Sequence, residues 1–113
     1  MNTLKQMDTQ NLIDISKTWN IIWLALFGSV ARGDDTENSD IDLAVRFGKP
    51  VNLFEIVNIQ MLMEAALGRS VDLIPIDDAY AFVHESMRED LVVLYEDDKH
   101  NTRITEKPAY ASR

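Results

Sequence analysis

Two groups of residues in this chain are suited to chemistry on phosphates. Gly28 and Ser29 follow directly after the apolar run LALF. Glycine permits a tight turn without a Cβ clash, and the unpaired N–H groups at the start of a following helical turn favour an anion. Ser29 adds a hydroxyl donor. After ten intervening residues come two carboxylates, Asp40 and Asp42. Gly28 and Ser29 therefore predict a phosphate-binding turn.

Asp40 and Asp42 lie in the sequence SDIDLAVRF, whose apolar and polar residues alternate. This alternation predicts a strand with both carboxylates on the same side. Neighbouring like charges are unfavourable unless a cation lies between them, and Mg²⁺ commonly binds one or two carboxylates together with substrate phosphates. The sequence therefore predicts a Mg²⁺ site. The alternative is a solvated strand edge that carries acidic side chains.

A third carboxylate, Asp72, interrupts the apolar run VDLIP. A buried carboxylate without a partner is costly, so Asp72 requires a partner, a metal or solvent. Its position at the start of a short predicted strand also allows an exposed aspartate, and the sequence leaves both interpretations open.

The motif GSVARG followed by SDIDLAV resembles the signature of the polymerase-β-like nucleotidyltransferases, and within them the minimal nucleotidyltransferase (MNT) branch. This branch is known chiefly as the antitoxin half of HEPN/MNT toxin–antitoxin pairs. The resemblance covers residues 21–95. It implies an α/β (α+β) fold with a small mixed sheet of about four strands and helices packed mainly on one face.

The resemblance also implies roles for individual residues. Asp40, Asp42 and Asp72 would hold one or two Mg²⁺ ions, and Asp72 would act as general base toward an acceptor hydroxyl. The cofactor-binding residues would be Gly28, Ser29 and Arg32, which would contact the phosphates of ATP. For Arg32, a second interpretation is that it braces its own loop by pairing with Asp34, Asp35 or Glu37.

By the same resemblance, the chain is expected to be the antitoxin of a type VII-like pair. It would transfer AMP from ATP to a tyrosine hydroxyl of a cognate HEPN ribonuclease toxin and would form a hetero-oligomer with that toxin. Two alternatives remain: an antitoxin that acts by binding alone, and a small-molecule nucleotidyltransferase with a separate substrate-binding subunit. A role as the toxin nuclease is disfavoured, because no Arg is followed after four to six residues by His, the arrangement that HEPN nucleases use.

Composition narrows the class of protein. The 113 residues predict one domain with a modest core. The absence of cysteine excludes disulfides, Cys-based zinc sites and a thiol nucleophile. No signal peptide or membrane-spanning run is recognised, which predicts a cytoplasmic protein. The net charge of -8 disfavours nucleic-acid binding. The acidity either serves solubility or complements a basic protein partner.

The elements that must position these residues follow from periodicity, caps and turn formers. The residues 1–96 are expected to form the nucleotidyltransferase domain and 97–113 a polar tail, flexible or partner-binding. The expected elements are a helix over 3–18, a buried strand over 21–27, a helical turn over 29–32, a strand over 39–47, a helix over 53–67, a strand over 69–75, a helix to about 89 and an edge strand over 91–95.

Two details of these elements can be checked against the structure. The helix over 53–67 begins with an Asn52 capping box and ends at Gly68, and its apolar positions are Leu53, Ile56, Val57, Met61 and Leu62. Met61 and Met63 are interpreted as core residues. His84 has no second ligand at metal spacing and is not expected to be catalytic.

Overall fold

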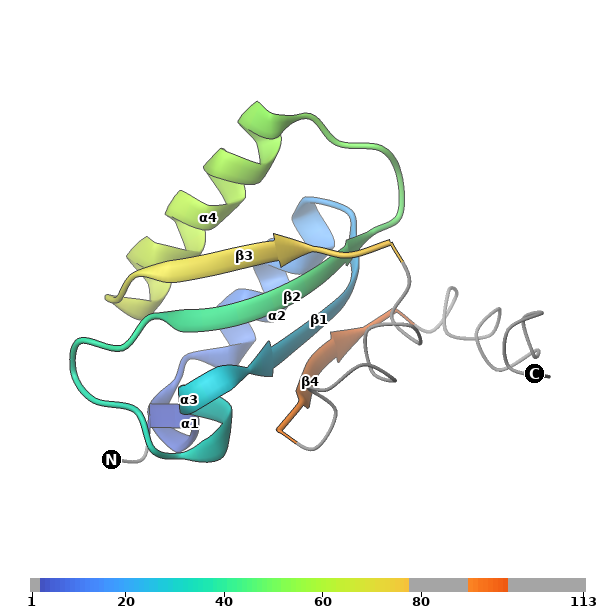
Figure 1. Cartoon of the computed structure of the whole chain (residues 1–113). Helices are drawn as coiled ribbons and strands as arrows, with labels where there is room; N and C mark the ends of the chain where they lie inside the picture. Colours follow the sequence, from blue (N-terminus) through green and yellow to red (C-terminus); the bar gives the residue numbers. More distant parts are fainter. Residues whose placement is uncertain (1–2, 78–89, 98–113) are drawn as a thin grey trace, which may run out of the picture.

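The computed structural model describes residues 3–77 and 90–97, which form a four-stranded mixed sheet with helices (Figure 1). The strand order is β3-β2-β1-β4. The elements, in chain order, are α1 (Thr3–Gln6), α2 (Thr9–Thr18), β1 (Ile21–Phe27), α3 (Gly28–Arg32), β2 (Ile41–Phe47), α4 (Leu53–Leu67), β3 (Val71–Pro75) and β4 (Val92–Glu96).

The strand β1 is the centre of the sheet, and all seven of its residues are buried. It pairs antiparallel with β2 on one side and with β4 on the other. The residue before it, Asn20, has a φ of 63°, a left-handed conformation that Asn tolerates better than most residues. This turn separates the end of α2 from β1.

The segment β2–α4–β3 is a crossover that places β3 parallel to β2. Asn52 caps the start of α4, because its side chain accepts a hydrogen bond from the Glu55 N–H while the Glu55 side chain accepts one from the Asn52 N–H. Gly68 ends the helix at a φ of 70°. The predicted capping box and stop are therefore confirmed, and the strand direction, which the sequence left open, is parallel.

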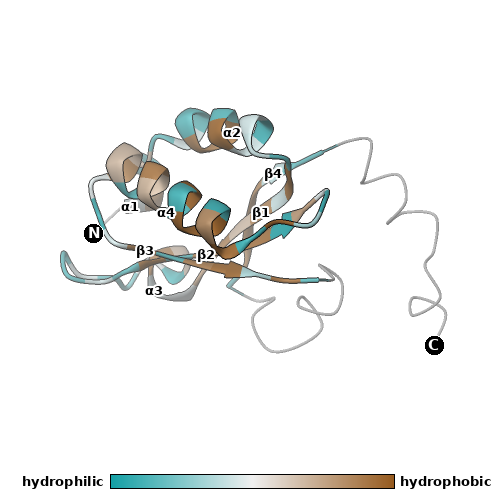
Figure 2. Ribbon diagram, turned by 90° about the horizontal axis from the view of Figure 1, so that it is seen from above, coloured by the Kyte–Doolittle hydropathy of each residue, from teal (hydrophilic) through white to brown (hydrophobic). Residues whose placement is uncertain are grey.

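The helices α1, α2 and α4 lie on one face of the sheet (Figure 2). The main core lies between these helices and the sheet. It contains apolar residues from the helices and, along the strands, mostly every second residue. These residues are Leu12, Ile21, Leu24, Leu26, Val30, Ile41, Leu43, Val45, Ile59, Met63, Val71 and Leu73. A smaller cluster on the other face holds Trp23, Ala25, Phe27 and Ala44. The predicted fold class is confirmed.

Two predictions about the helices are wrong in part. The region 3–18 is two helices, because the side chain of Asp8 accepts a hydrogen bond from the Asn11 N–H and starts a new helix at Thr9. Met63 is buried as predicted, but Met61 is 60% exposed. The helix α4 is apolar nearly all round, so its periodicity does not indicate which side faces the sheet.

None of the described helices is long and apolar enough to cross a membrane. The predicted helix up to residue 89, including His84, and the tail beyond Asp97 lie outside the described residues.

Candidate active site

The sheet places two of the predicted carboxylates side by side. In the parallel pairing of β2 with β3, Asp42 lies directly opposite Asp72. In the antiparallel pairing of β1 with β2, Phe27 lies opposite Asp42, so Gly28 starts at the same end of the sheet. Asp40 is exposed and immediately precedes β2. Three segments that are distant in sequence thus meet at one end of the sheet.

Asp42 and Asp72 project from the face opposite the main core. Their neighbours in each strand, Leu43 and Leu73, point toward α2 and α4 and are buried there, and side chains alternate along a strand. Asp42 is half-buried and Asp72 is exposed. The structure therefore supports the interpretation of Asp72 as an accessible group that lies next to a second carboxylate.

Gly28 is in direct contact with this site. Its φ of 78° is left-handed, and a Cβ at this position would overlap Oδ2 of Asp42 and lie 3.2 Å from its Cγ. Glycine is therefore required at residue 28 both for the turn and for the space that the Asp42 carboxylate occupies. The space is a cradle that any side chain larger than hydrogen would fill.

We expect the substitution Gly28→Ala to displace the Asp42 carboxylate. The left-handed backbone alone should lower the Tm by roughly 5–15 °C, and nucleotidyl transfer should fall by at least about 100-fold, because misplacing a catalytic group by about 1 Å costs that much. Gly33→Ala is the matched control: Gly33 has a φ of 84°, but nothing lies within 4 Å of its Cβ position. Equal activity losses in the two variants would contradict this role of Gly28.

The carboxylates repel one another. The pKa of Asp42 is raised above its ordinary value of 3.8, first by partial burial and then by the negative charges of Asp72 and Asp40. The positive charge of Arg32 acts in the opposite direction. A bound cation would relieve this repulsion, so the electrostatics of the site favour a metal ion.

The short helix α3 carries the predicted phosphate-binding residues. It begins directly after Phe27, which offers no side-chain cap, so the first N–H groups of α3 donate no hydrogen bond to a capping side chain. Such groups carry partial positive charge. The helix ends at Gly33, whose N–H donates to the carbonyl oxygens of Ser29 and Val30.

Arg32 pairs with Asp34, as one of the two sequence interpretations predicts. Its Nε donates to Oδ2 of Asp34 at 3.2 Å, and its Nη1 lies 3.6 Å from Oδ2 of Asp90. The bracing interaction with Asp34 is thus present. Because the Arg32 side chain is 45% exposed, it also remains accessible to a phosphate.

A buried network that the sequence analysis missed holds the loop between α3 and β2. The Arg69 guanidinium donates to Oδ2 of Asp35 at 3.1 Å, to the Thr3 hydroxyl at 3.1 Å and to the carbonyl oxygens of Thr36 and Ser39 at 2.9 and 2.6 Å. The Thr3 hydroxyl itself donates to Asp35 at 2.6 Å. The network fixes the loop that delivers Asp40 to the site.

Asp35 is the buried anion of this network. Its pKa is lowered, first by the hydrogen bond from Thr3 and also by Arg69, which together outweigh the opposing effect of burial. From the sequence, Asp35 was predicted only as a possible partner of Arg32. The sequence around Arg69, directly after the helix stop at Gly68, does not indicate its role, because its acceptors lie thirty or more residues away in the sequence.

The donor set fits Mg²⁺, because it consists of hard carboxylate oxygens on neighbouring strands. Within residues 3–77 and 90–97, however, no three His, Cys, Asp or Glu side chains converge on one point at metal-binding distance. Binding of a metal ion by Asp40, Asp42 and Asp72 therefore requires side-chain rotation, which the exposure of Asp40 and Asp72 allows.

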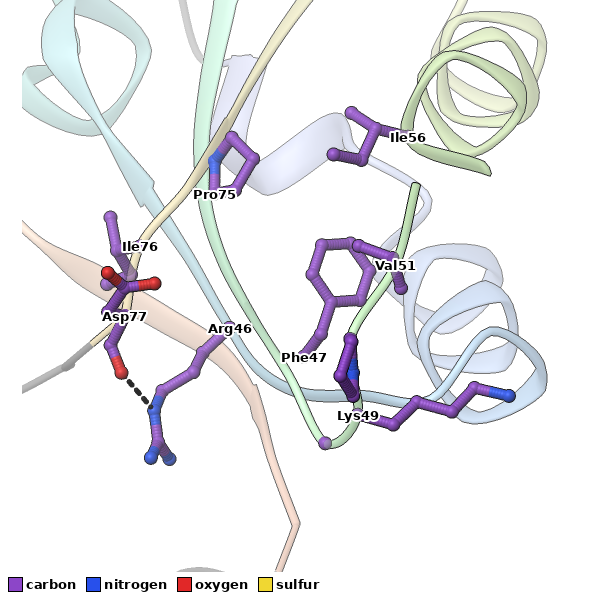
Figure 3. Close-up of a pocket in the computed structure, with 10 residues that line it drawn as sticks. Arg46, Phe47, Lys49, Val51, Ile56, Pro75, Ile76 and Asp77 are labelled. Carbon is purple, nitrogen blue, oxygen red and sulfur yellow. Dashed lines mark hydrogen bonds between the residues drawn. The ribbon is translucent and has the colours of Figure 1, made fainter. Parts of the chain in front are cut away.

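A cavity of about 500 Å³ lies at the opposite end of β2 and β3 from these carboxylates (Figure 3). Phe47, Val51 and Ile56 lie close together beneath the start of α4, and Arg46 donates from Nε to the Asp77 carbonyl oxygen at 2.9 Å. Arg46 is four residues along β2 from Asp42, a separation of roughly 13 Å. The cavity is therefore separate from the candidate active site.

Comparisons with known proteins identify the family of this chain. The family model described as "Polymerase beta, Nucleotidyltransferase" matches residues 10–100. The protein adenylyltransferase MntA of Thermococcus cleftensis is 30% identical over 77 residues, which are 66% of this chain and 78% of that protein. A Methanocaldococcus jannaschii relative whose name assigns it as a protein adenylyltransferase is 26% identical over 95 residues, 83% of this chain and 97% of that protein.

Solved structures share the fold. A chain of a toxin–antitoxin complex with AMP-PNP has a TM-score of 0.68 at 19% identity and covers 85% of this chain and 79% of that one. A chain from a complex of a tri-AMPylated Shewanella oneidensis HEPN toxin with an MNT antitoxin has a TM-score of 0.60 at 18% identity, covering 90% and 78%. The chain belongs to the polymerase β nucleotidyltransferase family, in the minimal branch that includes the adenylyltransferase MntA.

Proposed function

We propose that this chain transfers AMP from ATP to a tyrosine hydroxyl of a cognate HEPN ribonuclease toxin and thereby neutralises it. The observation that carries the proposal is the pairing of Asp42 with Asp72 beside Gly28, at one end of the sheet. This places carboxylates next to a turn suited to phosphate, which is the arrangement that nucleotidyl transfer requires.

Each residue has a distinct part in the proposed reaction. The backbone N–H groups at Gly28 and Ser29 bind the β and γ phosphates of ATP, and Arg32 supplies positive charge beside them. Asp72 accepts the proton of the tyrosine hydroxyl. The tyrosine oxygen then bonds to the α phosphorus, while the bond from that phosphorus to the pyrophosphate oxygen breaks and pyrophosphate leaves.

Asp40, Asp42 and Asp72 would hold Mg²⁺, which when bound neutralises the charge on the phosphates and on the leaving pyrophosphate. The half-buried position of Asp42 limits its hydration and strengthens its preference for a cation. The packing of Gly28 against this carboxylate orients it toward the turn that binds phosphate.

A protein acceptor is supported by the relatives and solved structures. One relative, 30% identical to this chain, is named a protein adenylyltransferase. One of the solved structures that share the fold is a complex that contains a tri-AMPylated HEPN toxin. A toxin–antitoxin complex with AMP-PNP supports an adenine nucleotide as the donor.

The test is the intact mass of the HEPN-class protein encoded beside this chain, after incubation with this chain, ATP and Mg²⁺. We expect the mass to rise by one or more AMP units, which peptide mapping assigns to tyrosine and which a Tyr→Phe variant of the acceptor loses. No increase in mass, together with persistent neutralisation of the toxin, would instead identify an antitoxin that acts by binding alone.

A further inference from the structure

The outer side of α4 is an apolar surface. Six large apolar side chains are exposed in the described part of the chain, and five of them lie on this one helix. They are Leu53, Phe54, Val57, Met61 and Leu62, and Phe54 is 81% exposed. A contiguous apolar patch on a water-exposed helix is typical of an interaction surface.

The exposed residues form a stripe rather than a scatter. Phe54, Val57, Met61 and Ala65 are spaced by three or four residues, so they lie along one side of the helix. Met61 and the buried Met63 are two residues apart, a rotation of about 200°, so the stripe faces away from the sheet. Among the described elements none covers this side of α4 (Figure 1). The stripe, called here the α4 stripe, is about 17 Å long.

A depression lies beside the α4 stripe. Its volume is about 390 Å³, and it is lined by Trp19, Asn58, Met61 and Leu62. Trp19 comes from the end of α2, so the depression lies between the two helices. Such a hollow next to a stripe with helical spacing suits a partner helix that inserts one large side chain.

The charges around the stripe indicate which kind of helix fits. The helix α4 contains no Lys or Arg, and it carries two acidic residues, Glu55 and Glu64. By helical rotation these lie on opposite flanks of the stripe. Oε2 of the partly buried Glu64 also accepts a hydrogen bond from the Val71 N–H at 3.0 Å. The whole chain has a net charge of -8. A partner helix with Lys or Arg on both sides of its own apolar residues would therefore be complementary.

A second copy of this chain fits less well. Its α4 also lacks Lys and Arg, and it carries the same net charge of -8. Two copies packed through their α4 helices would therefore bring like charges together without a basic residue on either helix to compensate them.

We infer that the α4 stripe docks a basic amphipathic helix of the acceptor protein, an inference that rests on the proposed function. The carboxylates Asp42 and Asp72 project from the opposite face of the sheet. Docking and AMP transfer therefore use different surfaces, so AMP transfer can be removed without loss of docking.

The experiment measures the affinity of this chain for the neighbouring HEPN-class protein by calorimetry. We expect Phe54→Glu/Met61→Glu to weaken binding by at least about 30-fold, the effect of losing an interface hot spot. Both side chains are exposed, so the fold should persist, which circular dichroism verifies. Val93→Glu is the matched control, because Val93 is 46% exposed on β4, away from α4, and should change the affinity less than about threefold.

The outcomes separate the inference from the proposed function. The Asp40→Asn/Asp42→Asn variant should bind as tightly as the wild type while transferring no AMP. Tight binding that depends on Phe54 and Met61, without any transfer, would support the inference and refute the proposed function. Unchanged affinity of the Phe54→Glu/Met61→Glu variant, no binding by the wild type, or a wild-type homodimer that this variant dissociates would each overturn the inference.

Discussion

Asp40→Asn/Asp42→Asn should abolish nucleotidyl transfer, with a loss of at least about 1,000-fold, while the folded protein becomes no less stable. The activity is lost because an amide carries no negative charge to bind a metal ion. The stability is kept because Asp42 is half-buried and lies next to Asp72 and Asp40, so its charge opposes folding. A raised carboxyl pKa means that the ionised form is disfavoured in the folded state.

This stabilisation has a defined pH dependence. The Asn variant gains stability relative to the wild type where Asp42 is ionised, above its raised pKa, and the gain disappears as the pH falls and Asp42 becomes protonated. Because the site is partly open to solvent, the gain should not exceed about 1 kcal/mol. Glu37→Gln, an exposed loop acid, is the control for both measurements.

Thermal unfolding and a pyrophosphate-release assay measure the two effects. A double variant that retains most of the transfer activity would contradict the assignment of these carboxylates to the metal site. A variant that loses activity and also unfolds at a much lower temperature would show that Asp40 and Asp42 are structural residues instead.

Arg69→Ala should be the most destabilising single change in the described part of the chain outside the apolar core. It removes the guanidinium that pairs with the buried Asp35 and that donates hydrogen bonds to the carbonyl oxygens of Thr36 and Ser39. Breaking a buried ion pair by removing one partner leaves an uncompensated charge, and the Tm should fall by roughly 10–20 °C.

Two variants isolate the cause of this loss. Arg69→Lys keeps the charge but lacks the planar fork that reaches several acceptors at once, so it should recover only part of the stability. Arg32→Ala removes an arginine whose ion pair with Asp34 is exposed, and it should change the Tm by no more than a few degrees. Equal effects of Arg69→Ala and Arg32→Ala would contradict the role of the buried network.

The same network predicts acid sensitivity. The pKa of Asp35 is lowered in the folded state, so its contribution to stability is present above its unfolded pKa, near 3.8, and is lost as the pH falls through the folded value. Asp35→Asn should therefore be less stable than the wild type at neutral pH, and the difference should shrink below about pH 4. Denaturant unfolding at pH 7 and pH 3 measures both quantities.

Several elements could be predicted from the local sequence, because a short pattern or a single residue type determines their structure. The alternation from Ile41 to Phe47 predicted β2, Asn52 and Glu55 predicted the start of α4, and the left-handed Gly68 ended it. Asp40 and Asp42 could be proposed as a pair because both lie on one short segment. Their closeness to Asp72 depended on the parallel pairing of β2 with β3, which the sequence left open.

Other features could not be predicted, because the residues that determine them are distant in the sequence or resemble their neighbours. Asp35 lies in a loop with several other polar residues, and nothing local distinguishes it as the one that Arg69 neutralises. A tight turn explains only part of the need for glycine at residue 28. The other part is the contact with the Asp42 carboxylate, which lies on another strand and could not be predicted from the local sequence. Met61 was predicted to be a core residue because Met commonly fills gaps in a core, but it is 60% exposed, and the apolar residues on both sides of α4 do not indicate which side is buried.

The parallel pairing of β2 with β3 also sets the time at which activity can arise during synthesis. Asp40 and Asp42 are translated well before β3, which begins at Val71, and Asp72 can join them only after the intervening α4 has closed the crossover. A nascent chain that ends before Val71 therefore carries the Gly28 turn and two of the three carboxylates, but it has no complete active site. The proposed transferase can therefore become competent only after the ribosome has released β3 for pairing.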